Sequence, residues 1–418
     1  MTSTASATTP TGISTRPVAQ RRVLAVLVGS QILSGAGLAA GITVGALLAQ
    51  DMLGSTDLAG LPSALFTAGS ALAAVVVGRI SQARGRRPGL AAGYLTGAVG
   101  SAGVIAAAVA DSPALLFIAL FVYGAGTATN LQARYAGADL AAPAHRARAV
   151  STVLVATTLG GVVGPNLAAP TGDLADTLGI PSLAGPFLLS GAAYALAALV
   201  LALWLRPDPL LLARSLDVQQ RAEGAEGTEA ETALARRSGL IPGALTMILT
   251  QLVMVAIMTM TPVHMHDHGH GTAASGLVIA IHVGAMYLPS PLTGWLVDRY
   301  GRMRIAVASG TTLLAAGLLA ATAPGDSVAL LAAALALLGL GWNFGLVSGT
   351  AMITDAVPLA TRAKTQGMVD VSIAIAGATG GLASGLVVST AGYPVLALTG
   401  GILALAVVPA IAATASSR

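Results

Sequence analysis

Methionine and histidine residues gather in one short stretch of this sequence. Residues 247–286 hold six of the eleven Met and five of the six His residues in a chain of 418. Thioether and imidazole groups are soft or borderline ligands, and together they favour Cu(I) over harder cations. The chain has no cysteine, so any soft-metal site must be built from Met and His.

Two pairs in this stretch have helical spacing. Met254 and Met258 are four residues apart, as are His282 and Met286, so each pair lies on one helix face. Met254 and His282 fall at nearly the same depth, roughly 13–14 Å below the ends of their predicted spans. A Met stripe alone usually indicates core packing, but a histidine inside a membrane segment indicates function. We therefore predict a Cu(I) site between these helices.

A His-rich segment, residues 264–270, lies between the two predicted helices. Alternating imidazoles are typical of metal binding, so we expect this segment to collect copper at the outer mouth. Binding of Zn(II) or Ni(II), pH sensing and a plain surface loop are the alternatives. The expected ligands are His264, Met265, His266, His268 and His270.

The composition is that of a membrane protein. Hydrophobic residues make up 55% of the chain and charged residues 9%, against about 25% charged residues in soluble domains. Apolar runs long enough to span a bilayer recur along the chain. We predict an all-α membrane protein with twelve transmembrane helices in two pseudo-symmetric halves of six. The predicted spans are 22–47, 58–79, 89–110, 113–134, 150–172, 184–205, 241–263, 273–296, 304–323, 327–350, 366–389 and 394–414.

Positive charge falls on one side of these spans. With the N-terminus inside, all 21 Arg and Lys residues lie on the cytosolic side, as the positive-inside rule requires. We expect a multi-pass protein of a bacterial-type cytoplasmic membrane with both termini cytosolic. The net charge of +4 then reflects topology, so the lipid bilayer is an expected partner and nucleic acid is not.

The chain divides at a polar segment between the two sets of spans. Residues 1–21 are predicted to form a disordered cytosolic tail and residues 22–206 the N-terminal half. Residues 207–240 form a cytosolic linker, and residues 241–414 form the C-terminal half.

The two halves match each other at an offset of 216 residues. Three of the matched pairs are Gly78 with Gly294, Gly85 with Gly301, and Arg86 with Arg302. Parallel six-helix repeats are one of the plans on which secondary transporters are built. The segment that ends in Asp298, Arg299, Gly301 and Arg302 resembles the loop signature of the major facilitator superfamily. That resemblance implies the superfamily fold and transport by alternating access.

The first-half copy of this signature departs from the pattern. Gln82 stands where the signature has an acid, and Ala83 stands where it has a base. The charge-pair lock of the signature is therefore expected only in the second half.

A second motif lies in the fifth predicted span. Gly160, Gly164 and Pro165 resemble the superfamily's drug-antiporter signature. The same residues also suit a helix-packing surface followed by a proline kink.

The Met and His pairs indicate a resemblance to one particular branch of this superfamily. Met254, Met258, His282 and Met286 match the motifs of the superfamily's copper-importing branch, whose bacterial members supply copper for assembly of haem–copper oxidases. The resemblance implies that Met254 and His282 matter most for transport. The resemblance also implies that copper is the substrate and that the protein has no cofactor. A copper chaperone is then a candidate partner.

The placement of carboxylates bears on the competing functions. We find no Asp or Glu near the middle of a predicted span, and Asp370 lies near the inner side. A proton-driven antiporter usually needs a buried carboxylate, whereas Cu(I) import can be driven by the membrane potential. A proton-coupled efflux carrier for small organic molecules and a metal sensor remain as alternatives, and no enzyme motif is present. The polar residues Gln31, Asn130, Asn166 and Asn343 are left without an assigned role.

Overall fold

The computed structural model describes residues 11–53, 61–222 and 229–409, and within these ranges every regular element is a helix. The α-helices are α1 Thr11–Leu53, α2 Leu61–Arg84, α3 Arg86–Val109, α4 Pro113–Ala138, α5 Arg146–Asn166, α6 Ala168–Thr177, α7 Gly185–Trp204, α8 Pro209–Ala222, α9 Glu229–Asp267, α10 Thr272–Tyr287, α11 Ser290–Tyr300, α12 Arg302–Thr322, α13 Val328–Ala356, α14 Arg362–Ala391 and α15 Tyr393–Ala404. Two short 3₁₀ helices, Pro143–His145 and Ser182–Ala184, precede α5 and α7.

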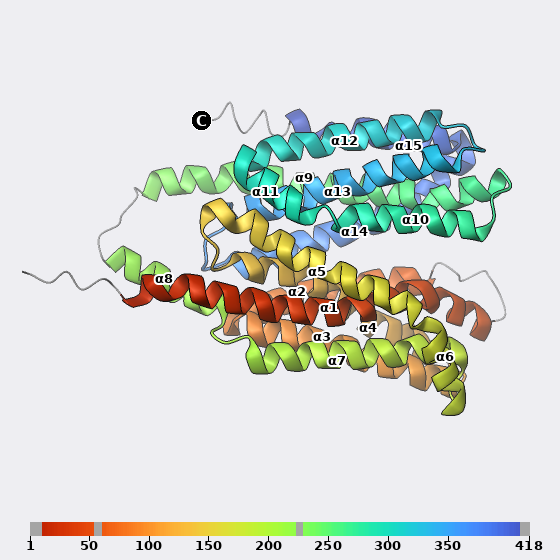
Figure 1. Ribbon diagram of the computed structural model, residues 1–418, viewed down its shortest axis with the longest axis horizontal. Helices are drawn as coiled ribbons and strands as arrows, with labels where there is room; N and C mark the ends of the chain where they lie inside the picture. Colours follow the sequence, from red (N-terminus) through yellow and green to blue (C-terminus); the bar gives the residue numbers. More distant parts are fainter. Residues whose placement is uncertain (1–10, 54–60, 223–228, 410–418) are drawn as a thin grey trace, which may run out of the picture.

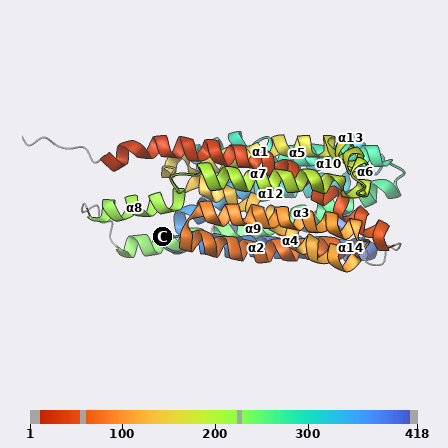
Figure 2. The ribbon, with the colours of Figure 1, turned by 90° about the horizontal axis from the view of Figure 1, so that it is seen from below.

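The helices form two bundles side by side. Helices α1–α7 make one bundle and α9–α15 the other, and the long helices run near the long axis of the molecule (Figures 1 and 2). One apolar core lies around Leu27 and Phe187 of the first bundle. The other lies around Leu335 and Val347 of the second bundle and extends to Val150 and Leu154 of α5. The chain is thus two helical units that meet along a long interface.

Ten stretches in the described part of the chain are long and apolar enough to cross a membrane. Helix α1 and the shorter α15 lie where the first and last predicted spans fall. The all-helical architecture agrees with the expectation from sequence, whereas the count of twelve spans stays a prediction.

Proline interrupts two of the predicted spans. The eighth span is divided between α10 and α11, with Pro289 before α11 and Pro291 in its first turn. The fifth continues past α5 into α6, with Leu167 between them. Proline lacks an N–H and its ring crowds the preceding turn, so helices break or bend there.

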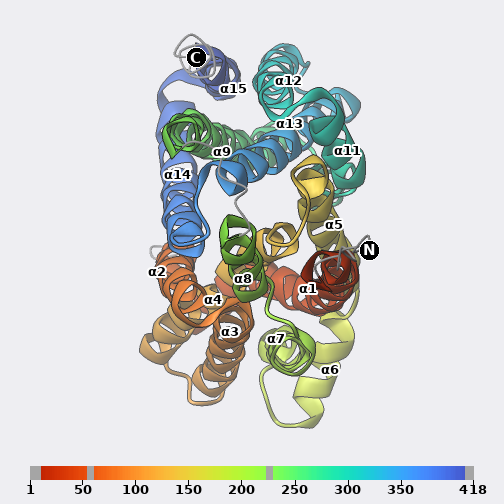
Figure 3. The same cartoon turned by 90° about the vertical axis from the view of Figure 1, so that its left-hand side faces the viewer.

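The terminal and linker segments contain helix. Helix α1 begins at Thr11, within the segment predicted to be a disordered tail, and residues 1–10 lie outside the described ranges. The linker 207–240 contains α8 and the start of α9. Leu210, Ala213 and Leu216 of α8 are buried, and Figure 3 shows α8 between the two bundles at one end of the molecule.

Two seams join the bundles. Helix α2 packs along α14, and α5 packs along α11. A side chain at Gly78 would come within 2.9 Å of the Ala363 oxygen, and one at Gly294 within 2.4 Å of Ser151 Oγ. Only glycine allows so close an approach, so both positions bring the halves together at the end that carries Arg86, Arg146 and Arg302, hereafter the arginine-rich end.

Candidate functional site

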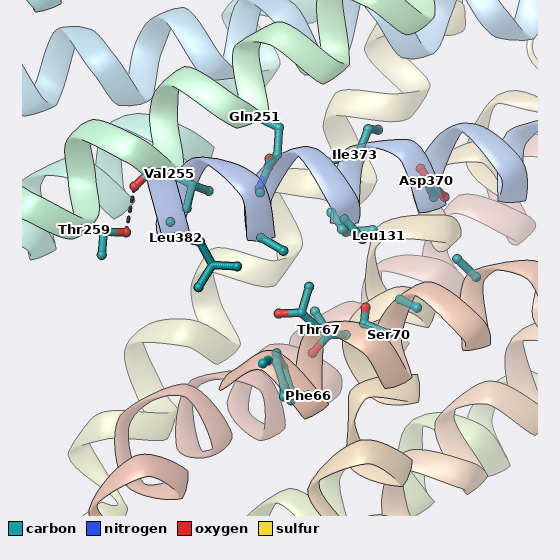
Figure 4. Close-up of a pocket in the computed structure, with 18 residues that line it drawn as sticks. Phe66, Thr67, Ser70, Leu131, Gln251, Val255, Thr259, Asp370, Ile373 and Leu382 are labelled. Carbon is teal, nitrogen blue, oxygen red and sulfur yellow. Dashed lines mark hydrogen bonds between the residues drawn. The ribbon is translucent and has the colours of Figure 1, made fainter. Parts of the chain in front are cut away.

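A cavity of about 450 Å³ lies between the two bundles. Helices α2 and α4 of the first bundle and α9 and α14 of the second line it (Figure 4). Its walls are mainly apolar, with Phe66, Leu131, Val255 and Ile373 among them. The volume is in the usual range for small-molecule sites.

Polar groups enter this cavity at a few points. Thr67 and Ser70 of α2 face Gln251 of α9 and Asp370 of α14 across the space (Figure 4). Among the described residues that line the cavity there is neither a methionine nor a histidine. A few polar groups on apolar walls are typical of a site for an organic molecule.

Asp370 is the charged group of the cavity. Its Oδ1 accepts hydrogen bonds from Arg134 Nη2 at 2.8 Å and from the Tyr135 hydroxyl at 3.2 Å. The other oxygen, Oδ2, is buried and has no hydrogen-bond partner among the described residues. The side chain of Asp370 therefore joins the two halves through one oxygen and leaves the second without a partner among the described residues.

The sequence did not predict this ion pair. Asp370 was placed near the inner side, and Arg134 was counted among the cytosolic charges. The Arg134 side chain is fully buried, and that of Asp370 is 5% exposed. Asp370 lies eight residues into α14, so it is about 12 Å from the start of that helix. The two residues are 236 positions apart in the chain, and only the packing of α4 beside α14 reveals the pair.

Gln251 is held in one orientation. Trp342 Nε1 donates to its Oε1 at 2.8 Å, and the Trp342 ring meets Tyr287 edge-on with centroids 5.6 Å apart. Opposite Gln251 lies Gly377, where a Cβ would come 3.2 Å from Gln251 Nε2.

Ion pairs close the arginine-rich end. Arg86 Nε lies 2.8 Å from Asp139 Oδ2, and both side chains are fully buried. Arg362 Nη1 of the second bundle approaches the same carboxylate at 3.8 Å. Asp355 pairs with both Arg146 and Arg302. Charged side chains from both bundles therefore contact one another between the cavity and the arginine-rich end of the molecule.

The two copies of the loop signature cap helices of the opposite bundle. Asp298 accepts hydrogen bonds from the backbone N–H groups of Ala147 and Arg148 at 3.1 and 3.0 Å, at the start of α5. In the matching place, Gln82 Oε1 accepts from Ala363 N at 2.8 Å, and its Nε2 donates to Ala360 O at 2.6 Å. The amide thus replaces the missing acid as a neutral link.

Other residues of the signature have separate places. Gly85 and Gly301 adopt φ angles of 100° and 99°, a conformation that suits glycine. Arg299 is exposed. Nearby, Arg16 Nε donates to Leu140 O at 2.9 Å, and burial together with the charge of Arg146 lowers the pKa of Arg16.

The predicted Met/His pairs lie within the second bundle. Met254 is buried at 4% exposure and Met286 at 7%, both in the apolar core of that bundle. The cavity-lining positions of α9 are Gln251, Val255 and Thr259, and the Met stripe is turned about 80° away from them. Helix α10 packs mainly along α13 rather than along α9.

His282 is fully buried at the α10–α13 contact. Its Nδ1 lies 2.9 Å from Leu335 O, and its Nε2 has no hydrogen-bond partner among the described residues. Asn343 donates to Met286 O at 2.6 Å and to Ser290 Oγ at 2.7 Å. Asn343 therefore fixes the α10 backbone and does not line the cavity.

The His-rich segment ends α9. The His264 ring stacks on Tyr393 with centroids 4.3 Å apart, His268 Nδ1 lies 2.8 Å from His264 O, and His270 Nε2 lies 2.9 Å from Gly325 O. Met265 is buried and His266 is exposed. Within the described ranges, no group of three or more His, Cys, Asp or Glu side chains is arranged to hold a metal ion.

The remaining motif residues pack the first bundle. A Cβ at Gly160 would lie 2.0 Å from Ile32 O, so this glycine brings α5 against α1. Gly164 is buried, and the side chain of Pro165 lies outside the described part.

Two of the polar residues without an assigned role belong to a buried network. Gln31 Nε2 donates to Asn130 O at 3.1 Å, and Asn130 Nδ2 donates to Ser34 Oγ at 2.9 Å. Asn166 is exposed and donates to Val162 O in its own helix.

Comparison with known proteins gives consistent results. The family described as Major Facilitator Superfamily matches residues 27–289 and 243–415. The uncharacterized MFS-type transporter YdeG of Bacillus subtilis (strain 168) is 59% identical, covering 94% of this chain and 91% of its own. The riboflavin transporter RfnT of Brucella anthropi is 32% identical, covering 85% of this chain and 86% of its own. Neither name mentions copper.

Solved structures share the fold. The human organic anion transporter MFSD10 (TETRAN) superposes with a TM-score of 0.73 at 16% identity, covering 94% of this chain and 99% of its own. The proton:xylose symporter XylE gives a TM-score of 0.71 at 16% identity, with 94% and 95% covered.

Proposed function

The chain belongs to the major facilitator superfamily of secondary transporters, and from that premise we propose that its cargo is a small organic molecule moved with proton coupling. It is a multi-pass membrane protein and a transport protein rather than an enzyme. We propose that it works by alternating access in a bacterial cytoplasmic membrane, with the arginine-rich end and both termini in the cytosol.

One observation carries the proposal. The cavity between the halves is apolar with an amide, hydroxyl groups and one carboxylate, and one oxygen of that carboxylate has no hydrogen-bond partner in the described part of the chain. Membrane-buried carboxylates are expensive and mark proton or substrate paths. When Asp370 takes a proton, its ion pair with Arg134 of the other half weakens, which links protonation to movement between the halves.

Riboflavin is the cargo that we propose to test first. The relative RfnT bears the name of a riboflavin transporter, and a flavin combines a flat apolar ring with polar edges. The cavity offers apolar walls at Phe66, Val255 and Ile373 with polar groups between them.

Transport in proteoliposomes tests this function. We expect a pH gradient to drive riboflavin accumulation by the wild-type protein. Asp370→Asn should abolish accumulation but leave exchange of labelled for unlabelled riboflavin, because exchange needs no net proton movement. Asp326→Asn, at an exposed loop position, is the matched control and should transport normally. Full gradient-driven uptake by Asp370→Asn would refute the role of this carboxylate.

Copper import is the second candidate function. It is favoured by His282, whose Nδ1 contact with Leu335 O leaves Nε2 as a free ligand atom in the described structure. A backbone contact of this kind is how metal-binding histidines are commonly oriented. Copper is the cargo if three results are found together. The wild-type proteoliposomes accumulate Cu(I), the Met254→Ala and His282→Ala variants do not accumulate it, and riboflavin is not transported.

A further inference from the structure

A single hydrogen bond sets the polarity of the cavity wall at α9. The indole N–H of Trp342 can only donate, and it lies 2.8 Å from Gln251 Oε1. The oxygen of the Gln251 amide therefore faces Trp342, and the two N–H donors of Nε2 face away. Trp342 is 4% exposed and contacts Tyr287 edge-on, so its ring is held in place.

The freed donors are directed into the cavity. Nε2 points toward Gly377 of α14, where even a Cβ would lie only 3.2 Å away. Both Gln251 and Gly377 line the cavity. Because Gly377 has no side chain, it does not cover the amide on the cavity side.

A hydrogen-bond acceptor, the carboxylate of Asp370, lies at another position on the same helix α14. Asp370 is seven residues before Gly377 on this helix, so the two positions are about 10 Å apart along its axis. Oδ2 of Asp370 is a buried acceptor without a partner among the residues that the structure describes, while the amide of Gln251 turns only its donors away from Trp342. A cargo that fits both must carry a hydrogen-bond acceptor at one end and lie along α14.

We propose that Gln251 is a specificity-determining residue that donates to a ring carbonyl of the cargo, and that Trp342 is its positioning residue. This inference rests on the proposed function and names the chemical class of its cargo: an elongated, flat molecule with a carbonyl edge, as in the flavin ring. A cargo with only donors at that edge would leave the amide unsatisfied, which is costly in a dry site.

Binding of two flavins to the purified transporter tests the assignment. The probes are riboflavin and lumiflavin, which has the same ring but lacks the ribityl chain, and quenching of flavin fluorescence reports their affinity. Gln251→Met keeps the side-chain length and removes the donors. It should weaken both flavins about tenfold, the usual effect of losing a hydrogen bond of about 1.4 kcal/mol.

Variants at other positions separate positioning from folding. Trp342→Phe keeps an aromatic ring but frees the amide to rotate, so affinity should fall by less than in Gln251→Met. Gln219→Ala, at an exposed position on α8, should bind as the wild type does. Thermal unfolding of each variant confirms that the protein is folded.

The outcomes distinguish the two proposals. If Gln251→Met binds both flavins as tightly as the wild-type protein does, the role of Gln251 is overturned and the organic-cargo function still stands. Loss of riboflavin affinity with unchanged lumiflavin affinity overturns the ring-carbonyl assignment, because the contact then lies on the ribityl chain. A wild-type protein that binds neither flavin overturns both this inference and the flavin as cargo.

Discussion

At the scale of residues, the central feature is a buried ion pair between the halves. Arg134 Nε donates to Thr350 Oγ1 at 3.1 Å, and its guanidinium carbon lies 4.3 Å from the centre of the Tyr135 ring. Together with Asp370, these contacts join α4 to α13 and α14. Removing one partner of such a pair leaves the other charge buried and uncompensated.

A double-mutant cycle measures this coupling. Arg134→Gln alone should destabilise the protein by about 3–5 kcal/mol, because Asp370 loses its counter-charge. Adding Asp370→Asn should recover part of that loss, since neither charge is then left alone. The measurement is unfolding in detergent for both single variants and the double variant. Losses that simply add would show that the two side chains are not coupled.

Residue types alone could not reveal this pair. The sequence identifies Asp298 and Gly294 as motif residues, and both lie at the contact between bundles. Asp370 and Arg134 lie near the ends of apolar runs, where a charge ordinarily faces water or a lipid headgroup. Their partnership depends on tertiary packing between distant helices.

At the scale of elements, α8 is a brace across the arginine-rich end. Arg214 Nη2 donates to Gln82 O of the first bundle at 2.9 Å, and its Nε donates to Leu359 O of the second at 3.3 Å. Asp208, just before α8, accepts from Arg87 N at 2.7 Å. The linker helix is thus hydrogen-bonded to both bundles.

Loss of this brace should favour opening of the arginine-rich end. The chain has no cysteine, so spin labels can be placed at Cys residues introduced at the exposed positions Ala83 and Lys364. We expect Arg214→Ala to increase the population with a long distance between the labels, measured by pulsed electron paramagnetic resonance. Gln219→Ala is the control on the same helix. Identical distance distributions in Arg214→Ala and the control would exclude α8 as a brace.

The elements also explain where the copper hypothesis departs from the structure. Helical periodicity correctly groups Met254 and Met258 on one face, and both pack in the core of the second bundle. Spans that are neighbours in sequence were taken to be neighbours in space. In the structure α9 and α10 contact each other, but α13 packs more extensively along both. Sequence periodicity does not specify which helix a face contacts.

At the scale of the whole molecule, the two bundles meet closely at the arginine-rich end, and the cavity lies between them beyond that end. The ion pairs of Asp139 and Asp355 and the glycine contacts of Gly78 and Gly294 lie at the arginine-rich end. The cavity begins beyond them, with Asp370 among its lining residues. This arrangement fits one state of an alternating-access cycle, in which the halves move about the cavity.

The repeat of 216 residues indicated from the sequence that two similar halves exist. It could not indicate how the halves differ. Asp298 caps α5 with a charge, whereas the neutral Gln82 caps α14 and is supported by α8. The cavity is likewise asymmetric, with its carboxylate and amide both in the second half.

In the proposed mechanism, binding of an organic cargo is linked to protonation of Asp370. Calorimetric titration of riboflavin into the purified protein, in buffers of different ionisation enthalpy, measures the protons exchanged on binding. We predict proton exchange in the wild-type protein and none in Asp370→Asn. Equal proton exchange in both proteins, or no riboflavin binding to the wild type, would exclude this linkage.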